Sequence, residues 1–232
     1  ALLALDMHLG PQLTRVEPYQ AGTQRLAALH REMRDSGARG LRYIDIGGGL
    51  SVRYEDEDVP DLDRFAGMVH QVVAPTQLAL IMEPGRFIVG NAGVLVATVL
   101  YRKHSGGKEY VIGDAGMTEL LRPSHYGAYH RVEPVVTQTE RGTRTITPDI
   151  VGPVCESGDF LALDREIADV QPGELIVIHD VGAYGYAMAS NYNARRRAAE
   201  VLVDGDRFAV VTRRESYDDL VRLDVDEPQW RA

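Results

Sequence analysis

The sequence predicts an α/β segment followed by a mostly antiparallel β domain. In the first ninety residues, short apolar runs alternate with longer stretches in which apolar residues recur at helical spacing, a pattern typical of repeated βα units with a parallel sheet. From about Val94 onward, β-branched runs bounded by Gly, Pro or Asp follow one another instead. This change predicts two domains, residues 1–93 and residues 94–232.

The first segment is predicted to hold three strands and two helices. The strands are the apolar runs at residues 1–5, 41–46 and 78–82. Helical spacing joins Leu26, Leu29 and Met33 in one set, and Leu62, Phe65, Val69 and Val72 in another. Gly37 is placed to end the first helix. Because ligands of parallel α/β sheets bind at the carboxyl ends of the strands, the residues after each strand are candidates for a site.

The second segment is predicted to be a mostly antiparallel β domain. The runs lie at residues 94–101, 110–112, 132–139, 143–150, 174–179, 200–203 and 208–212. Asp204-Gly205 separates the last two runs and is a typical hairpin turn.

Net charge and composition limit the classes of partner that this chain is expected to bind. The chain has 232 residues, enough to bury a large core, and a formal net charge of -9 that opposes binding to nucleic acid or anionic membranes. No apolar run approaches the length of roughly 20 residues that a membrane span needs. The single cysteine, Cys155, fits a reducing, cytoplasmic setting. We therefore expect a small-molecule or protein partner, with no nucleic acid and no membrane.

Glycine and polar residues follow the first two strands. The run Ile44-Asp45-Ile46-Gly47-Gly48-Gly49 places three glycines where a strand gives way to a turn, so that backbone N–H groups can approach an anion such as phosphate. A tight turn without a ligand fits the residues equally well. His8 ends the first strand, where an imidazole can stack on a ligand or simply hydrogen-bond within the fold.

The third strand ends in Glu83-Pro84-Gly85-Arg86, which supplies a carboxylate, bare backbone and a guanidinium within four residues. Such a set can bind a polar ring together with an anion. A buried ion pair between Glu83 and Arg86 is the structural alternative.

A loop in the second segment carries Cys155-Glu156. A protonated thiol on a loop can act as a general acid, whereas a small buried cysteine is the structural alternative. Polar and cationic residues recur at 191–197, where a solvated arginine face is the simpler interpretation. The histidines show no spacing typical of a metal site, so no metal is expected.

Taken in order, these motifs resemble the fold-type III pyridoxal-phosphate-dependent decarboxylases. The segments that carry the resemblance include YIDIGGGLSVRY, EPGRFIVGNAG, GDAGMTELLRPSHYGAYH and GPVCESGD. Within that family the chain is most similar to the branch that converts meso-2,6-diaminopimelate to L-lysine and CO₂. The resemblance implies an alanine-racemase-like (β/α)₈ TIM barrel, of which this chain holds the C-terminal part, followed by an antiparallel β domain with dimer contacts.

The resemblance also implies roles for individual residues. Pyridoxal phosphate would be bound by His8, Gly48, Gly49, Glu83, Pro84, Gly85, Arg86 and Tyr184. The amino-acid substrate would be bound by Arg86, Arg122, Tyr126, Glu156 and Tyr184. Cys155 would return a proton to the substrate carbon, and a homodimer would share its active sites because Cys155 and Glu156 reach the other subunit.

Two departures from the family pattern stand out. Pro11 occupies the position of a serine near the phosphate, and neither Lys103 nor Lys108 occupies the position of the lysine that binds the cofactor. We therefore expect a partial enzyme with little activity on its own. The alternatives are a related decarboxylase acting on ornithine, lysine or a carrier-bound amino acid, and a non-catalytic homologue that pairs with an intact subunit.

Overall fold

A computed structural model describes residues 2–136 and 144–230. The chain divides into two compact units, each described by itself below. The N-terminal unit comprises Ala1–Val94 with His179–Ala183, and the C-terminal unit comprises Leu95–Ile178 with Tyr184–Ala232.

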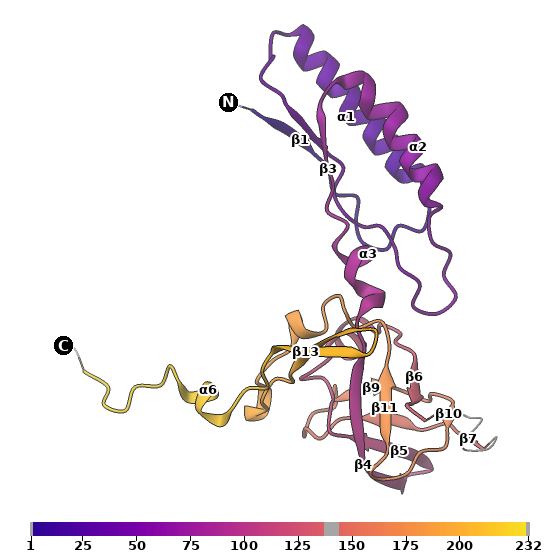
Figure 1. Cartoon of the computed structure of the whole chain (residues 1–232), viewed down its shortest axis with the longest axis vertical. Helices are drawn as coiled ribbons and strands as arrows, with labels where there is room; N and C mark the ends of the chain where they lie inside the picture. The colour runs from indigo at the N-terminus through magenta and orange to yellow at the C-terminus, as the bar shows by residue number, and fades with distance from the viewer. Residues whose placement is uncertain (1, 137–143, 231–232) are drawn as a thin grey trace. The chain divides into compact units, whose positions relative to one another are not determined.

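The N-terminal unit contains a parallel three-stranded sheet with two long helices (Figure 1). Its elements are β1 (Ala4–Asp6), α1 (Glu17–Asp35), β2 (Tyr43–Asp45), α2 (Leu62–Val73) and β3 (Ala79–Ile81). The sheet order is β1-β2-β3, and both helices lie together on one side of the strands in Figure 1. The predicted βα units and parallel sheet are therefore confirmed. The short helices η1 (Ala74–Thr76), α3 (Gly85–Val89) and η2 (Gly90–Ala92) complete the unit.

The two long helices begin and end as their sequences dictate. Pro18 and Glu17 occupy the first turn of α1, and Gly37 follows its end with φ 93°. The Asp61 carboxylate caps α2 by accepting the N–H groups of Asp63 and Arg64 at 2.9 and 3.0 Å. Among the described residues, no helix combines the length and apolarity that crossing a membrane requires.

The core of this unit lies between the helices and the sheet. It is formed by buried side chains of α1, α2, β1 and β2 and of the segments that adjoin them, namely Leu5, Val16, Tyr19, Leu26, Leu41, Ile44, Ile46, Leu50, Phe65, Met68, Val69 and Val73. This packing sets the position of the strand ends, where the predicted site residues lie.

The C-terminal unit is built on a six-stranded sheet in the order β6-β11-β4-β5-β8-β9. Its strands are β4 (Leu95–Ser105), β5 (Lys108–Gly113), β6 (Val132–Pro134), β8 (Asp149–Val151), β9 (Phe160–Ala162) and β11 (Leu175–Ile178). Every neighbouring pair is antiparallel except β5 and β8, which run parallel. The prediction of a mostly antiparallel domain is confirmed.

Several strand boundaries differ from the prediction. The run at 143–150 is not one strand: β7 (Thr145–Ile146) pairs with β10 (Ile167–Ala168), while β8 joins the large sheet. Pro148 separates the two because proline has no N–H for a ladder. The predicted strand 132–139 ends at Pro134 as β6, and its residues 137–139 lie outside the described residues. The strands β9 and β10 and the helices α4 (Arg122–Tyr126) and α6 (Tyr217–Val221) were not predicted.

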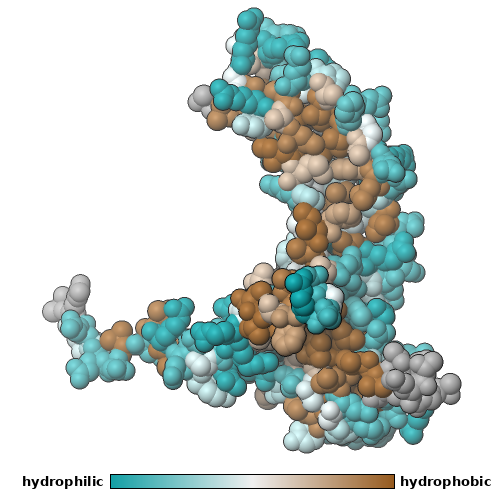
Figure 2. Space-filling model, viewed as in Figure 1, coloured by the Kyte–Doolittle hydropathy of each residue, from teal (hydrophilic) through white to brown (hydrophobic). Residues whose placement is uncertain are grey.

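The predicted hairpin at Asp204-Gly205 is confirmed. β12 (Glu200–Asp204) and β13 (Arg207–Thr212) form a separate two-stranded ribbon, and Gly205 adopts φ 62° in its turn. Large apolar side chains of both strands are exposed, namely Val201, Leu202, Val203, Phe208, Val210 and Val211. Apolar surface is visible in this region of the C-terminal unit in Figure 2.

Candidate functional site

The ends of the three parallel strands bring His8, the glycine turn and Glu83 into contact. The N–H of Gly48 points at Nδ1 of His8, 3.4 Å away. A Cβ atom added to Gly48 would lie only 2.3 Å from the carbonyl oxygen of Glu83. The first three motifs of the sequence therefore meet at one edge of the sheet.

The turn at residues 47–49 requires glycine, because neighbouring backbone atoms occupy the space that side chains would need. Cβ atoms on Gly47 and Gly49 would lie 2.4 and 2.1 Å from the carbonyl oxygens of Met7 and Gly10, and both glycines have positive φ. The N–H of Gly47 is bound by the Asp45 carboxylate at 2.9 Å. Within the described part of the chain, no hydrogen bond engages the N–H of Gly49, which leaves that donor for an anion.

Tyr19 holds this turn through a buried hydrogen bond, a role that the sequence did not predict. Its hydroxyl donates to the carbonyl oxygen of Gly48 at 2.7 Å, and the residue is 1% exposed. Burial raises the pKa of Tyr19 to about 12. Its ring packs edge-on against Phe65, with centroids 5.1 Å apart. The available signal was a tyrosine on the buried face of a helix, since a buried phenol needs a hydrogen-bond partner.

At the third strand end, Glu83 and Gly85 leave room for a ligand. Glu83 is exposed, so the alternative of a buried ion pair with Arg86 is wrong. Arg86 instead contacts Tyr54, donating from Nη1 to the phenol oxygen at 3.1 Å. A Cβ on Gly85 would meet no atom within 4 Å.

In the C-terminal unit, helix α4 carries the candidate residues Arg122 and Tyr126. Arg122 is 6% exposed, and its Nη1 lies 2.9 Å from Nε2 of His130. Because a guanidinium only donates, this ring nitrogen is the acceptor and His130 carries its proton on Nδ1. Tyr126 is exposed. The buried His130 orients Arg122 and is a further residue that the motifs did not single out.

The Cys155–Glu156 loop lies beside α4. A Cβ on Gly158 would contact the side chain of Ser124 in α4 at 3.5 Å. Cys155 is an exposed free thiol, which rules out the alternative of a small buried cysteine. Glu156 is also exposed, and its Oε2 lies 3.5 Å from the Tyr192 hydroxyl. The loop and the helix that carry the predicted proton donor and substrate residues are therefore neighbours.

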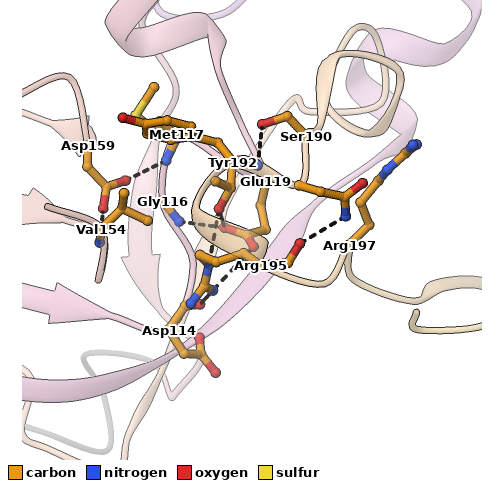
Figure 3. Close-up of polar contacts among 12 residues, drawn as sticks. Asp114, Gly116, Met117, Glu119, Val154, Asp159, Ser190, Tyr192, Arg195 and Arg197 are labelled. Carbon is orange, nitrogen blue, oxygen red and sulfur yellow. Dashed lines mark hydrogen bonds and ion pairs between the residues drawn. The ribbon is translucent and has the colours of Figure 1, made fainter. Parts of the chain in front are cut away.

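Arg195 ties a third segment to this cluster (Figure 3). Its guanidinium donates to the Thr118 hydroxyl at 3.2 Å and to Glu119 at 3.3 Å, and also binds the carbonyl oxygen of Asp114. The buried Glu119 carboxylate in turn accepts the N–H of Gly116 at 2.9 Å. For Arg195, the simpler interpretation as part of a solvated arginine face is wrong.

The remaining candidates behave differently from one another. Tyr184 is exposed and has φ 65°, a left-handed conformation that non-glycine residues adopt mainly where the surroundings impose it. Lys108 forms ion pairs with Asp149 and Asp164 at 3.0 and 3.2 Å. Its hydrogen bond to Asp149 raises the pKa of the Lys108 amine, which keeps the amine protonated and poorly nucleophilic. Lys103 is exposed on β4.

Comparison with known proteins assigns the class. Residues 19–182 match the family model described as "Pyridoxal-dependent decarboxylase, C-terminal sheet domain", so the chain belongs to the pyridoxal-dependent decarboxylases. The curated relatives that it resembles include diaminopimelate decarboxylases. The enzyme from Pseudomonas fluorescens is 47% identical over 94% of this chain and 51% of its own length.

Solved structures agree with this assignment. The crystal structure of diaminopimelate decarboxylase from Helicobacter pylori, complexed with L-lysine, superposes with a TM-score of 0.87 at 38% identity, covering 95% of this chain and 54% of that one. A lysine/ornithine decarboxylase from Vibrio vulnificus, complexed with cadaverine, gives a TM-score of 0.75 at 26% identity over 84% of this chain and 52% of that one. The chain spans about half the length of the curated relatives it matches.

Proposed function

We propose that this chain is the C-terminal part of a pyridoxal-phosphate-dependent diaminopimelate decarboxylase, which releases L-lysine and CO₂ from meso-2,6-diaminopimelate. The observation that carries the proposal is the buried Arg122 on α4, next to the loop of Cys155 and Glu156. A fixed guanidinium suits a substrate with a second carboxylate, because it can bind that group through two parallel hydrogen bonds. Identity of 47% to a diaminopimelate decarboxylase supports the same substrate.

The N-terminal unit supports membership of a larger barrel. Its strands follow in sequential order with both helices on one side, as in a segment of a (β/α)₈ barrel. Tyr43, Leu80 and Ile81 on the strands are each more than a third exposed, whereas parallel sheets are normally covered on both faces. We infer that further strands of the complete protein close the barrel and supply the lysine that binds the cofactor.

The residues at the strand ends fit pyridoxal phosphate. The unfilled space at Gly85 and the N–H of Gly49 suit its phosphate, and the exposed Glu83 carboxylate can hold a proton on the pyridine nitrogen. His8 and Arg86 border the same edge, next to Pro84, and the family resemblance would add Tyr184 to the residues that bind the cofactor. When bound, the cofactor supplies an electron sink for the charge left on the substrate carbon as CO₂ departs.

The substrate would be oriented by its distal end. By the family resemblance, Arg86, Arg122 and Tyr184 would bind the distal carboxylate. Glu156 would pair with the distal ammonium, and Tyr126 would contact the same end of the substrate. Cys155 then donates its thiol proton to the carbon that has lost CO₂. The exposed Cys155 thiol can protonate the substrate only if its loop reaches an active site. We infer that this active site belongs to a second subunit in a homodimer.

The exposed apolar side chains of the β12–β13 ribbon indicate that this ribbon packs against another part of the protein or another subunit. A two-stranded ribbon alone is marginally stable, and the exposed Val203 and Phe208 would be desolvated in an assembly. This surface is consistent with the homodimer but also with contacts inside the complete chain.

The substrate assignment is tested in the complete protein by measuring CO₂ release from meso-diaminopimelate, lysine and ornithine. We expect turnover of diaminopimelate alone. Arg122→Ala should lower kcat/KM for it by on the order of 100-fold or more, because a substrate carboxylate is left unpaired. Arg122→Lys is the matched control, because it keeps the charge and loses the paired hydrogen bonds. Its kcat/KM for diaminopimelate should lie between those of wild type and Arg122→Ala. Faster release from lysine or ornithine than from diaminopimelate would overturn the assignment in favour of a diamine-forming decarboxylase.

A further inference from the structure

We propose that Asp159 is a positioning residue that holds the Cys155–Glu156 loop in the shape needed for proton transfer. The inference rests on the proposed function for the role of Cys155, but the anchoring itself rests on contacts within the C-terminal unit. Asp159 is not among the residues to which the family resemblance gives a role.

Asp159 closes the loop at its base with both side chain and backbone. One carboxylate oxygen accepts the N–H of Val154 at 2.6 Å, immediately before Cys155. The Asp159 carbonyl accepts the N–H of Gly152 at 2.9 Å, and its own N–H donates to the carbonyl of Glu156 at 3.0 Å. Both ends of the loop are therefore held by Asp159, and Cys155 lies between them.

The other carboxylate oxygen reaches a different segment. It accepts the N–H of Met117 at 2.7 Å (Figure 3). Met117 lies five residues before Arg122, the substrate residue of α4. A single carboxylate thus fixes the loop of the proton donor relative to the segment that leads into the substrate helix.

The surroundings of this carboxylate are built to receive it. Asp159 is 4% exposed, and Cβ atoms on Gly116 and Gly152 would lie 2.1 and 2.4 Å from its oxygens. The two glycines also face each other closely, since a Cβ on Gly152 would lie 2.6 Å from Cα of Gly116. The glycines of two separate sequence motifs are therefore explained by one buried side chain.

The hydrogen bonds require a carboxylate and not merely a side chain of that size. Both oxygens accept backbone N–H groups, so an amide in the same position would turn its NH₂ group toward one of two donors. Asp159→Asn keeps the volume while breaking one anchor. It is therefore the sharpest probe of the loop's position.

The experiment uses the complete protein and four variants: Asp159→Asn, Cys155→Ser, their combination, and Asp149→Asn. Asp149 is a matched control, because it is 6% exposed in the same unit and also accepts a backbone N–H, that of Asp164 at 2.8 Å, but does not touch the loop. Measured quantities are kcat and KM for diaminopimelate, the rate of alkylation of Cys155 by iodoacetamide, and thermal unfolding by circular dichroism.

We expect Asp159→Asn to lower kcat by about tenfold or more, since small displacements of reacting groups cost rates of this order. It should also change the alkylation rate of Cys155 several-fold, whereas Asp149→Asn changes neither. The decisive result is the double variant. If Asp159 acts through Cys155, its kcat should match that of Cys155→Ser alone within about threefold, because the two residues form one unit.

Losses in kcat that multiply in the double variant would overturn the proposal, as would an Asp159→Asn protein with unchanged kcat and alkylation. Cys155→Ser with a wild-type kcat would instead contradict the proposed proton donor. In that case the alkylation rate decides: a changed rate in Asp159→Asn supports the anchor, and an unchanged rate refutes it.

Discussion

Replacement of Tyr19 by phenylalanine should weaken the glycine turn through one buried hydrogen bond. The ring and its edge-on contact with Phe65 are retained, while the carbonyl of Gly48 loses the donor that lies 2.7 Å away. A buried acceptor left without a partner costs about 1–3 kcal/mol. We therefore expect the free energy of unfolding of the N-terminal unit to fall by this amount at neutral pH.

The same substitution should alter the response to alkali. Burial raises the pKa of Tyr19 from 10 to about 12, so above about pH 10 the unfolded chain releases the phenol proton before the folded protein does. Wild-type stability from this group is complete below about pH 10 and is lost as the pH rises to about 12. Two pKa units correspond to at most about 2.7 kcal/mol. Tyr19→Phe lacks this loss, so the gap between the two proteins should narrow with rising pH.

Urea unfolding followed by far-ultraviolet circular dichroism measures both effects. Helices α1 and α2, with 19 and 12 residues, report chiefly on the N-terminal unit. Titration of other groups is common to both proteins and cancels in their difference. An unfolding free energy of Tyr19→Phe within about 0.3 kcal/mol of wild type at neutral pH would refute the role of the hydrogen bond, and a gap that stays constant up to about pH 11 would refute the buried phenol.

Four further substitutions, two at glycines and two at His130, separate folding from ligand binding. Gly48→Ala should destabilise the protein by about 1–3 kcal/mol, because its Cβ would lie 2.3 Å from the carbonyl oxygen of Glu83. Gly85→Ala should melt like wild type and weaken binding of pyridoxal phosphate, because its Cβ meets no atom within 4 Å. Equal melting temperatures of the two variants would contradict this difference. His130→Phe should raise KM for diaminopimelate about tenfold with little change in kcat, since Arg122 loses the acceptor that orients it. His130→Gln keeps an acceptor and should recover part of the loss in affinity. A fall in kcat with unchanged KM would exclude a role of His130 in orienting Arg122.

Local patterns predicted the elements and the strand ends well. The spacing of Leu26, Leu29 and Met33 identified α1, and the turn at Asp204-Gly205 identified the last hairpin. Both signals act over a few residues and depend on periodicity and turn chemistry alone. The strand at 143–150 was predicted wrongly because Pro148 interrupts it, a local signal that the apolar pattern outweighed.

The supporting residues of the site could not be predicted in this way. Tyr19 binds a carbonyl 29 residues away, and Arg195 binds Glu119 across 76 residues. No local pattern marks such partners, because burial and distance between segments decide them. Exposure likewise decided between the two interpretations of Cys155. A run of turn-forming residues does not settle whether its thiol lies on the surface or is buried.

The contacts of Asp159 have a consequence for a dimer with shared sites. The loop it closes would serve the neighbouring subunit, while the segment of Met117 leads to Arg122, which serves the subunit's own site. One carboxylate would then stand between two catalytic centres. Loss of the Asp159 carboxylate would then disturb a group of each of two sites, Cys155 in one and the segment that leads to Arg122 in the other.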